Sequence, residues 1–219
     1  MSVSDEEQRM LIVLVSLNKV VAPVLQQFIK QGMDNHYKFL DGQLRTLKPA
    51  CSLSTLTHLS VTSDPSLKLL IKSFEFGNIN SNLDTHGRAR NMYDYKVISS
   101  IDLAKLYLPT YLAKFSAFDK SLDVSAILRL LGIRSPVSIF PSSHPVICVQ
   151  TIADDVRDNV RNKAAHFNEC EWTETFFQEC FAKMETLVKS IVLPVAIEKA
   201  TLDKLSEWKN QGGKSISKK

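Results

Sequence analysis

Apolar residues recur at helical spacing along most of this chain, and this periodicity restricts the fold more than any other feature. Between residues 171 and 193, large apolar side chains return every three or four positions. They form one ridge (Trp172, Phe176, Cys180, Met184, Leu187 and Ile191) and a second ridge beside it (Phe177, Phe181, Val188 and Val192). A face this wide is typical of a mostly buried helix. No segment alternates persistently between polar and apolar residues as a half-buried strand does, so the sequence predicts an all-α fold, a single-domain helical bundle.

Proline, glycine and capping residues divide the periodic sequence into helices. Ser4 with Glu7 has the pattern of a capping box, and Asp64 followed by Pro65 is typical of a helix start. We expect helices over residues 5–32 (bent at Pro23), 37–47, 66–74, 97–115 (kinked at Pro109), 121–132, 149–166 and 171–193. Pro194 bends or interrupts the continuation of the last one, which gives a long, partly kinked C-terminal helix. Residues 77–93 and 211–219 lack an apolar period and are expected to form a loop and a disordered tail.

Positive charge is concentrated at the C-terminal end. The net charge is +4, and residues 199–219 hold six lysines against Asp203 and Glu207, so the first 198 residues are electrically balanced. We expect one domain over residues 1–198, followed over 199–219 by a basic helical extension with a flexible tail or linker. Because the domain has no overall positive field, any contact with RNA must come from a local patch.

Several functional classes are disfavoured by what the sequence lacks. The apolar run 10–17 follows acidic residues and precedes no cleavage site, and neither it nor 191–197 reaches the about 20 apolar residues of a membrane-spanning helix. The four cysteines show no C-x-x-C pairing, which is typical of reduced core thiols in the cytosol (Cys51, Cys148, Cys170 and Cys180). Glycine motifs for phosphate binding or for a nucleophile elbow are absent. The sequence therefore predicts a cytoplasmic protein with no membrane contact, no metal and no cofactor.

One stretch combines residue types suited to phosphodiester chemistry. Residues 149–166 carry an apolar stripe at helical spacing (Val149, Ile152, Val156, Val160 and Ala164), so the polar residues between them should face solvent. These include Arg161, Asn162 and His166. Histidine titrates near neutrality and arginine is a planar donor suited to phosphate, so they fit attack of a ribose 2′-hydroxyl on its phosphate. Arg157 and Lys163 are candidates for further phosphate contacts, although all these residues also fit a solvated helix surface that His166 closes.

Helical geometry disfavours a site within one chain. At about 100° per residue, Arg161 and His166 point about 140° apart, whereas Asn162 and His166 share one face at i, i+4. Asn162 is therefore expected to orient the imidazole or to satisfy carbonyls at the helix end. Two copies of the helix that cross near a two-fold axis would line a shared cleft. The face of 171–193 is also wider than one neighbouring helix needs, and both observations predict a symmetric homodimer.

The Arg-Asn-x-x-x-His core at 161–166 resembles the signature of the HEPN superfamily. The resemblance covers most of residues 5–195. It includes an apolar N-terminal helix, the segment 118–131 (Phe-Asp-x-Ser-Leu-Asp-Val-x-x-Ile-Leu-Arg-Leu-Leu), a proline-rich loop, the motif helix and a tryptophan-bearing helix. Within the superfamily, this pattern is similar to the HEPN-type domain of the DAZ-interacting zinc-finger ubiquitin ligase and its relatives.

The resemblance implies an all-helical homodimer whose motif helices meet at a composite site that cuts or binds RNA without a metal. By motif position, His166 would act as general acid or base, Arg161 would stabilise the charge of the phosphorane, and Asn162 would hold the geometry. An alternative stays open, a catalytically inactive HEPN module that serves as an interaction or dimerisation adaptor in a larger signalling or ubiquitin-ligase-like protein. Weaker candidates for RNA contact lie in the expected 77–93 loop (His86, Arg88 and Arg90).

Overall fold

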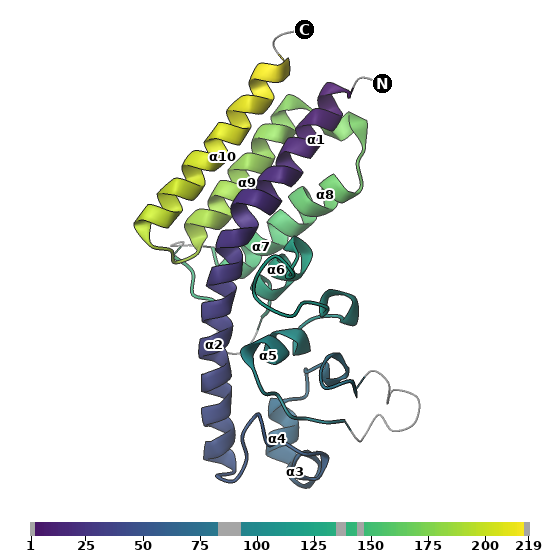
Figure 1. Ribbon diagram of the computed structural model, residues 1–219, viewed down its shortest axis with the longest axis vertical. Coiled ribbons are helices and arrows are strands. Elements are labelled where there is room, and N and C mark those ends of the chain that lie inside the picture. Colours follow the sequence, from purple (N-terminus) through teal and green to yellow (C-terminus); the bar gives the residue numbers. More distant parts are fainter. Residues whose placement is uncertain (1–2, 83–92, 135–138, 144–146, 217–219) are drawn as a thin grey trace. The chain divides into compact units, whose positions relative to one another are not determined.

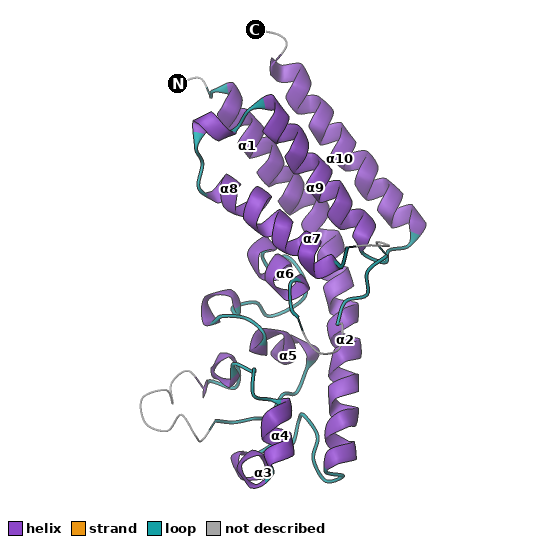
Figure 2. Ribbon diagram, turned by 180° about the vertical axis from the view of Figure 1, so that it is seen from behind, coloured by secondary structure: helices purple, strands orange, loops and turns teal. Residues whose placement is uncertain are grey.

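The computed structural model describes residues 3–82, 93–134, 139–143 and 147–216 (Figure 1). Helices form nearly all of its regular structure, which confirms the predicted all-α class (Figure 2). The described residues contain no β-strand, and one isolated antiparallel bridge pairs Ser142 with Ile191. Contacts within the chain divide it into two compact units, Met1–Phe28 with Asp123–Lys219 (unit 1) and Ile29–Leu122 (unit 2). The single domain expected over 1–198 takes in all of unit 2 and most of unit 1, and it stays a prediction.

The first helical stretch, Asp5–Leu47, is longer than the sequence indicated. It comprises α1 (Asp5–Ser16), a π-helical turn (Leu17–Val21) and α2 (Ala22–Leu47). At its start, Ser4 and Glu7 form the predicted capping box. The predicted break between residues 32 and 37 is wrong. Burial of Met33 and Leu40 outweighs the helix-propensity cost of Gly32, which is about 1 kcal/mol relative to alanine.

Pro23 does not end this helix, because a π turn precedes it. Proline lacks an N–H, and in a regular helix its ring collides with the carbonyl of residue i−4, here Lys19. In the π turn, the Ala22 N–H donates instead to the Leu17 carbonyl, five residues back. This wider turn relieves the constraint that proline imposes on the preceding turn.

Among the residues that the structure describes, Asp5–Leu47 is the one helix long and apolar enough to cross a membrane, judged by length and composition alone. The most apolar 18-residue window of this helix has a mean hydropathy of 1.6. Charged residues are sparse in this window, although it contains no long unbroken apolar run. Half of that window is buried, and the helix lies near the N-terminus. The expected absence of membrane contact stays a prediction.

Unit 1 is a helical bundle built around α9 (Glu174–Ser190). α1, α7 (Val149–Val156) and α10 (Val195–Ile216) pack against α9, and Figures 1 and 2 show α1, α9 and α10 side by side. α6 (Val124–Leu131) packs against α7 and is capped by Asp123, which accepts a hydrogen bond from the Ala126 N–H. The largest fully buried side chains of the unit are aromatic (Trp172, Phe140, Phe177 and Phe181).

The wide apolar face of α9 is covered within the chain. Its buried residues are shared among three intrachain neighbours, α1, α7 and α10 (Phe177, Cys180, Phe181, Met184, Leu187 and Val188). The width of this face was one reason to predict a homodimer. Because the face is covered within the chain, it gives that prediction no support. The width reflects a central position in the bundle.

The C-terminal part of the chain forms two separate helices. α9 ends at Ser190, and Pro194 interrupts the helix, so α10 is not a kinked continuation of α9. α10 runs to Ile216, so the disordered tail expected from residue 211 is wrong for 211–216. Extending an existing helix adds one hydrogen bond per residue fixed, which offsets the low propensity of Gly212 and Gly213.

Unit 2 contains the C-terminal part of α2 and three short helices, α3 (His58–Ser63), α4 (Pro65–Leu70) and α5 (Ser100–Leu106), with 3-10 turns at Phe76–Asn78 and Thr110–Leu112. Asp64 caps α4 as predicted by accepting from the Ser66 and Leu67 N–H groups. The expected helix 97–115 is shorter than predicted. Pro109 ends it, because the residue before a proline is pushed away from helical backbone angles.

Candidate functional site

The predicted motif helix is interrupted by a second π turn. It consists of α7, the π turn Arg157–Arg161 and α8 (Asn162–Ala165). The Asn162 N–H donates to the Arg157 carbonyl, five residues back. The expected apolar stripe is buried (Val149, Ile152, Val156, Val160 and Ala164). The polar residues of the motif therefore lie on the outer side of the helix, as predicted, and π turns of this kind occur frequently at functional sites.

Arg157 is held by two carboxylates of its own helix. Its Nη1 donates to Asp154 Oδ1 at 2.6 Å, and its Nε and Nη2 donate to the two oxygens of Asp158 at 2.9 and 3.1 Å. The hydrogen bond to Asp158 and the charges of both carboxylates raise the pKa of Arg157 above its usual value, against the effect of burial. The guanidinium expected to contact RNA is thus neutralised within the chain.

Asp158 also connects Arg157 to the core of the motif. The Asn162 amide donates to Asp158 Oδ1 at 3.4 Å, and the Asn162 oxygen accepts from Arg161 Nη1 at 3.2 Å. Asn162 therefore holds Arg161, its neighbour in sequence, through a side-chain hydrogen bond.

His166 lies at the end of α8 and is exposed. Its backbone leaves the helical region, with φ −117 and ψ 64, and its N–H donates to the Asn162 carbonyl at 3.0 Å. In the described part of the chain, its imidazole makes no hydrogen bond or ion pair. The structure thus brings the side chains of Asn162 and Arg161 together. Asn162 and His166 are joined by a backbone hydrogen bond alone. The expected contact between the amide and the imidazole is absent from these residues.

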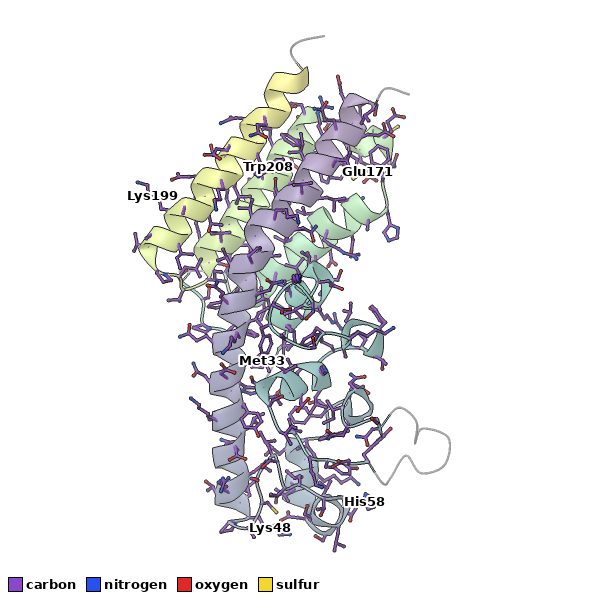
Figure 3. All side chains as sticks on the ribbon, viewed as in Figure 1. Met33, Lys48, His58, Glu171, Lys199 and Trp208 are labelled. Atoms are coloured by element: carbon purple, nitrogen blue, oxygen red, sulfur yellow. The ribbon has the colours of Figure 1, made fainter. Side chains whose placement is uncertain are left out.

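Lys163 is paired with an acid beyond the turn. Its Nζ lies 2.8 Å from Glu171 Oε2, and Glu171, labelled in Figure 3, ends the 3-10 turn Glu169–Glu171. The hydrogen bond from Lys163 holds the pKa of Glu171 below its usual range. Asn168 caps this turn, as its amide oxygen accepts from the Cys170 N–H. Lys163, a predicted phosphate contact, therefore bridges the motif helix to the turn that follows it.

A further ion pair fixes the motif helix to α9. Lys183 Nζ lies 2.9 and 2.7 Å from the two oxygens of Asp155, and Asn159 donates to the same carboxylate at 2.6 Å. Burial alone raises the pKa of Asp155, but the hydrogen bonds from Lys183 and Asn159 outweigh it and hold that pKa below its usual value. This contact orients the outer face of the motif relative to the bundle.

Arg161 differs from the other cations of the site. Arg157, Lys163 and Lys183 each have a carboxylate within 3 Å. Arg161 has none within 4.0 Å among the described residues, and an uncharged amide is its side-chain partner. Its positive charge is therefore available to an anion.

Sequence reasoning missed Asp158 and Glu171 as residues that organise the site. The Asp158–Asn162 spacing of i, i+4 could have indicated the first contact. The Lys163–Glu171 contact depends on the path of the turn, which spacing does not give. Cys148 and Cys170 are exposed, so the expectation that all four cysteines lie in the core is wrong for these two.

Two expectations are not addressed by the described residues. His86, Arg88 and Arg90 lie outside them. Within the described part of the chain, no group of three or more histidine, cysteine, aspartate or glutamate side chains is placed to hold a metal ion. Metal-independent chemistry stays a prediction.

Comparison with known proteins returns no relative. No protein-family model matches the chain, and no curated protein or solved structure is significantly similar to it.

Proposed function

We propose that this protein binds RNA and cleaves it without a metal, with Arg161, Asn162 and His166 as a composite site between two copies of the chain. The observation that carries the proposal is the pairing of chemistries at one helix end, an arginine without a carboxylate partner and an exposed histidine. The resemblance of 161–166 to the HEPN signature supports the same assignment.

Each motif residue has a distinct role in this proposal. His166 exchanges a proton with the 2′-hydroxyl or the leaving oxygen, because imidazole titrates near neutrality. Arg161 stabilises the negative charge that develops on phosphorus oxygens. The Asn162 side chain positions Arg161 through the 3.2 Å hydrogen bond, and Asn162 reaches His166 through its backbone carbonyl. This differs from the role expected from helical spacing.

The proposed dimer contact lies near the end of α8. Phe167, next to His166, is 38% exposed. A large exposed apolar side chain beside the motif suits an isologous contact. Such a contact would bring one copy's His166 towards the other copy's Arg161.

A second candidate function is an inactive adaptor that binds proteins within a larger cytoplasmic parent. The ion pairs of Arg157 and Lys163 favour it, since they neutralise two of the three cations in 157–163. An RNA-binding surface gains most of its affinity from cations that are free to meet phosphates.

Cleavage assays in EDTA separate the two functions. We expect the full chain to cut single-stranded or structured RNA in EDTA and to leave 2′,3′-cyclic phosphate ends, and we expect His166→Ala to abolish this. Absence of both cleavage and low-salt RNA retention would contradict the proposal and favour the adaptor.

A further inference from the structure

Unit 2 contains a pocket of about 440 Å³ that the motif does not use. Four aromatic residues line it, together with two lysines and a histidine (Phe74, Phe76, Tyr93, Tyr95; Lys68, Lys72; His58). Figure 3 labels His58, at the start of α3. The volume falls within the roughly 300–1,000 Å³ typical of small-molecule sites.

The aromatic residues form one continuous wall. The ring centroids of Phe76 and Tyr95 are 4.7 Å apart, those of Phe74 and Phe76 are 5.8 Å apart, and those of Tyr93 and Tyr95 are 6.2 Å apart. The amide of Asn82 donates to the carbonyls of Phe76 and Asp94 at 2.7 and 2.9 Å. These hydrogen bonds fix the backbone on both sides of the wall, so the rings are preorganised.

The charge of the pocket is positive. Lys68 and Lys72 are exposed, and no carboxylate lies within 4.0 Å of either ammonium among the described residues. Within the described residues, the lining contains no aspartate or glutamate. Both cations are therefore available to an anionic group at the edge of the aromatic wall.

His58 adds an unsatisfied polar atom. Its Nδ1 is buried and has no hydrogen-bond partner in the part of the chain that the structure describes, and its ring lies 6.1 Å from that of Tyr95. Buried polar atoms without partners are rare, because leaving one unpaired costs about 1–3 kcal/mol.

We propose that this pocket binds a nucleotide unit, with the base against the Tyr95–Phe76 wall and the phosphate at Lys68 and Lys72. Aromatic side chains beside lysines are the combination by which proteins hold single nucleotides and unpaired bases. An uncharged apolar ligand would leave both lysines without a partner, and inorganic phosphate would leave the aromatic wall open. The site lies within unit 2 and holds whether or not Arg161 and His166 cut RNA.

Titration calorimetry with the full chain tests the site. We expect saturable binding of AMP, and binding of adenosine or inorganic phosphate that is about tenfold weaker or more, since each lacks one half of the recognition. Lys68→Gln/Lys72→Gln should weaken AMP binding about tenfold. Lys114→Gln/Lys120→Gln, which removes the same charge from exposed positions of unit 2 outside the pocket, should leave it unchanged.

A 2′-O-methyl RNA octamer, which lacks the 2′-hydroxyl needed for cleavage, identifies the source of the nucleotide. Tighter binding of the octamer than of AMP points to single-stranded RNA, and binding of AMP alone points to a free nucleotide. No saturable binding of either probe, or equal loss in the two double variants, overturns the proposal. Because the pocket lies outside the motif, a failed cleavage assay with intact AMP binding counts against the proposed nuclease alone.

Discussion

Arg157 and Arg161 lie four residues apart on one helix, yet their surroundings differ. Arg157 contacts two carboxylates within 3 Å, whereas Arg161 contacts the neutral amide of Asn162. An ion pair must be broken before its cation can bind a phosphate, so Arg161 is the better anion site although both arginines fit the same sequence pattern. Residue type alone does not distinguish the two arginines, because their partners decide which guanidinium is available.

Substituting the motif residues should separate function from stability. His166 is exposed and Arg161 is half-buried without a carboxylate partner among the described residues, so His166→Ala and Arg161→Ala should each change the free energy of unfolding by no more than about 0.5 kcal/mol and should abolish RNA cleavage. Asn162→Ala should cost more, because it leaves Arg161 and Asp158 without a shared partner. Thermal melts of the variants measure these differences.

Val156→Asp serves as the destabilised reference for this comparison. Val156 is fully buried in the stripe beneath the motif, and an unpaired carboxylate there should cost several kcal/mol or unfold the domain. Melting of Arg161→Ala or His166→Ala as low as that of Val156→Asp would show that the motif is scaffold, and the nuclease proposal would then fail.

Stability should also depend on the protonation of His36. Burial lowers the pKa of His36 from 6.5 to about 4, and its Nε2 lies 2.7 Å from the Tyr107 hydroxyl. Because the unfolded chain binds this proton more tightly, stability is complete above pH 6.5 and falls as the pH drops towards 4, by about 3 kcal/mol in total. Urea unfolding measures this effect. Between pH 7.5 and 4.5, the free energy of unfolding should fall by about 2–3 kcal/mol more in the unmodified chain than in His36→Gln. Equal losses in both proteins would contradict this assignment.

At the scale of elements, periodicity and caps predicted helices well where the signals agree. The capping box at Ser4, the Asp64 cap and the stop at Gly132 all occur in the structure. Prolines were harder to interpret. Pro109 ends α5, whereas Pro23 lies inside a 43-residue helix because a π turn precedes it. No residue pattern distinguishes these two outcomes, because the sequence does not show where a π turn forms.

Burial of Arg9 was not predicted and has a structural role. Its side chain is 10% exposed and donates to the Trp172 carbonyl at 3.0 Å, with Glu6 and Glu174 at 3.3 Å. Arg9 therefore joins α1 to the residues that begin α9. The sequence shows a charged residue on an apolar helix, but two of its partners, Trp172 and Glu174, are more than 160 positions away.

Arg9→Met should destabilise unit 1 by about 1–3 kcal/mol, because a buried carbonyl loses its donor. Arg134→Met is a matched control. It removes the same charge from a residue that is 74% exposed and pairs with Asp154 at 3.4 Å, so it should cost less than about 1 kcal/mol. Urea unfolding midpoints of the two variants measure the difference. Equal midpoints would show that the guanidinium does not dock α1.

At the scale of the whole molecule, fold class was predictable and subunit organisation was not. The all-α class follows from periodicity, but the same apolar width that marks α9 as buried cannot show whether the neighbour is intrachain or a second copy. The structure assigns that face to α1, α7 and α10. The proposed dimer therefore depends on the motif and on exposed Phe167.

A mixture of two inactive variants tests the shared site. If each site takes Arg161 from one copy and His166 from the other, mixing Arg161→Ala with His166→Ala should restore one intact site per heterodimer. When equal amounts exchange subunits randomly, half of the dimers are heterodimers with one of two sites intact, so about a quarter of full activity is expected. Cleavage rates of the mixture and of each variant alone provide the measurement. A mixture as inactive as its components, under conditions where light scattering shows exchange, would place the site within one chain.

The π turn Arg157–Arg161 holds one residue more than the same length of regular helix needs. Deleting a single residue there, such as Asn159, would let α7 and α8 join as an ordinary helix without breaking the chain. Because a π turn absorbs its extra residue within one turn, the flanking helices would keep their orientation about the common axis. Asp158 and Asn162 would then lie three positions apart instead of four, and both spacings place two side chains on one face of a helix. A protein without the extra residue could therefore keep the acid and the amide of the motif side by side.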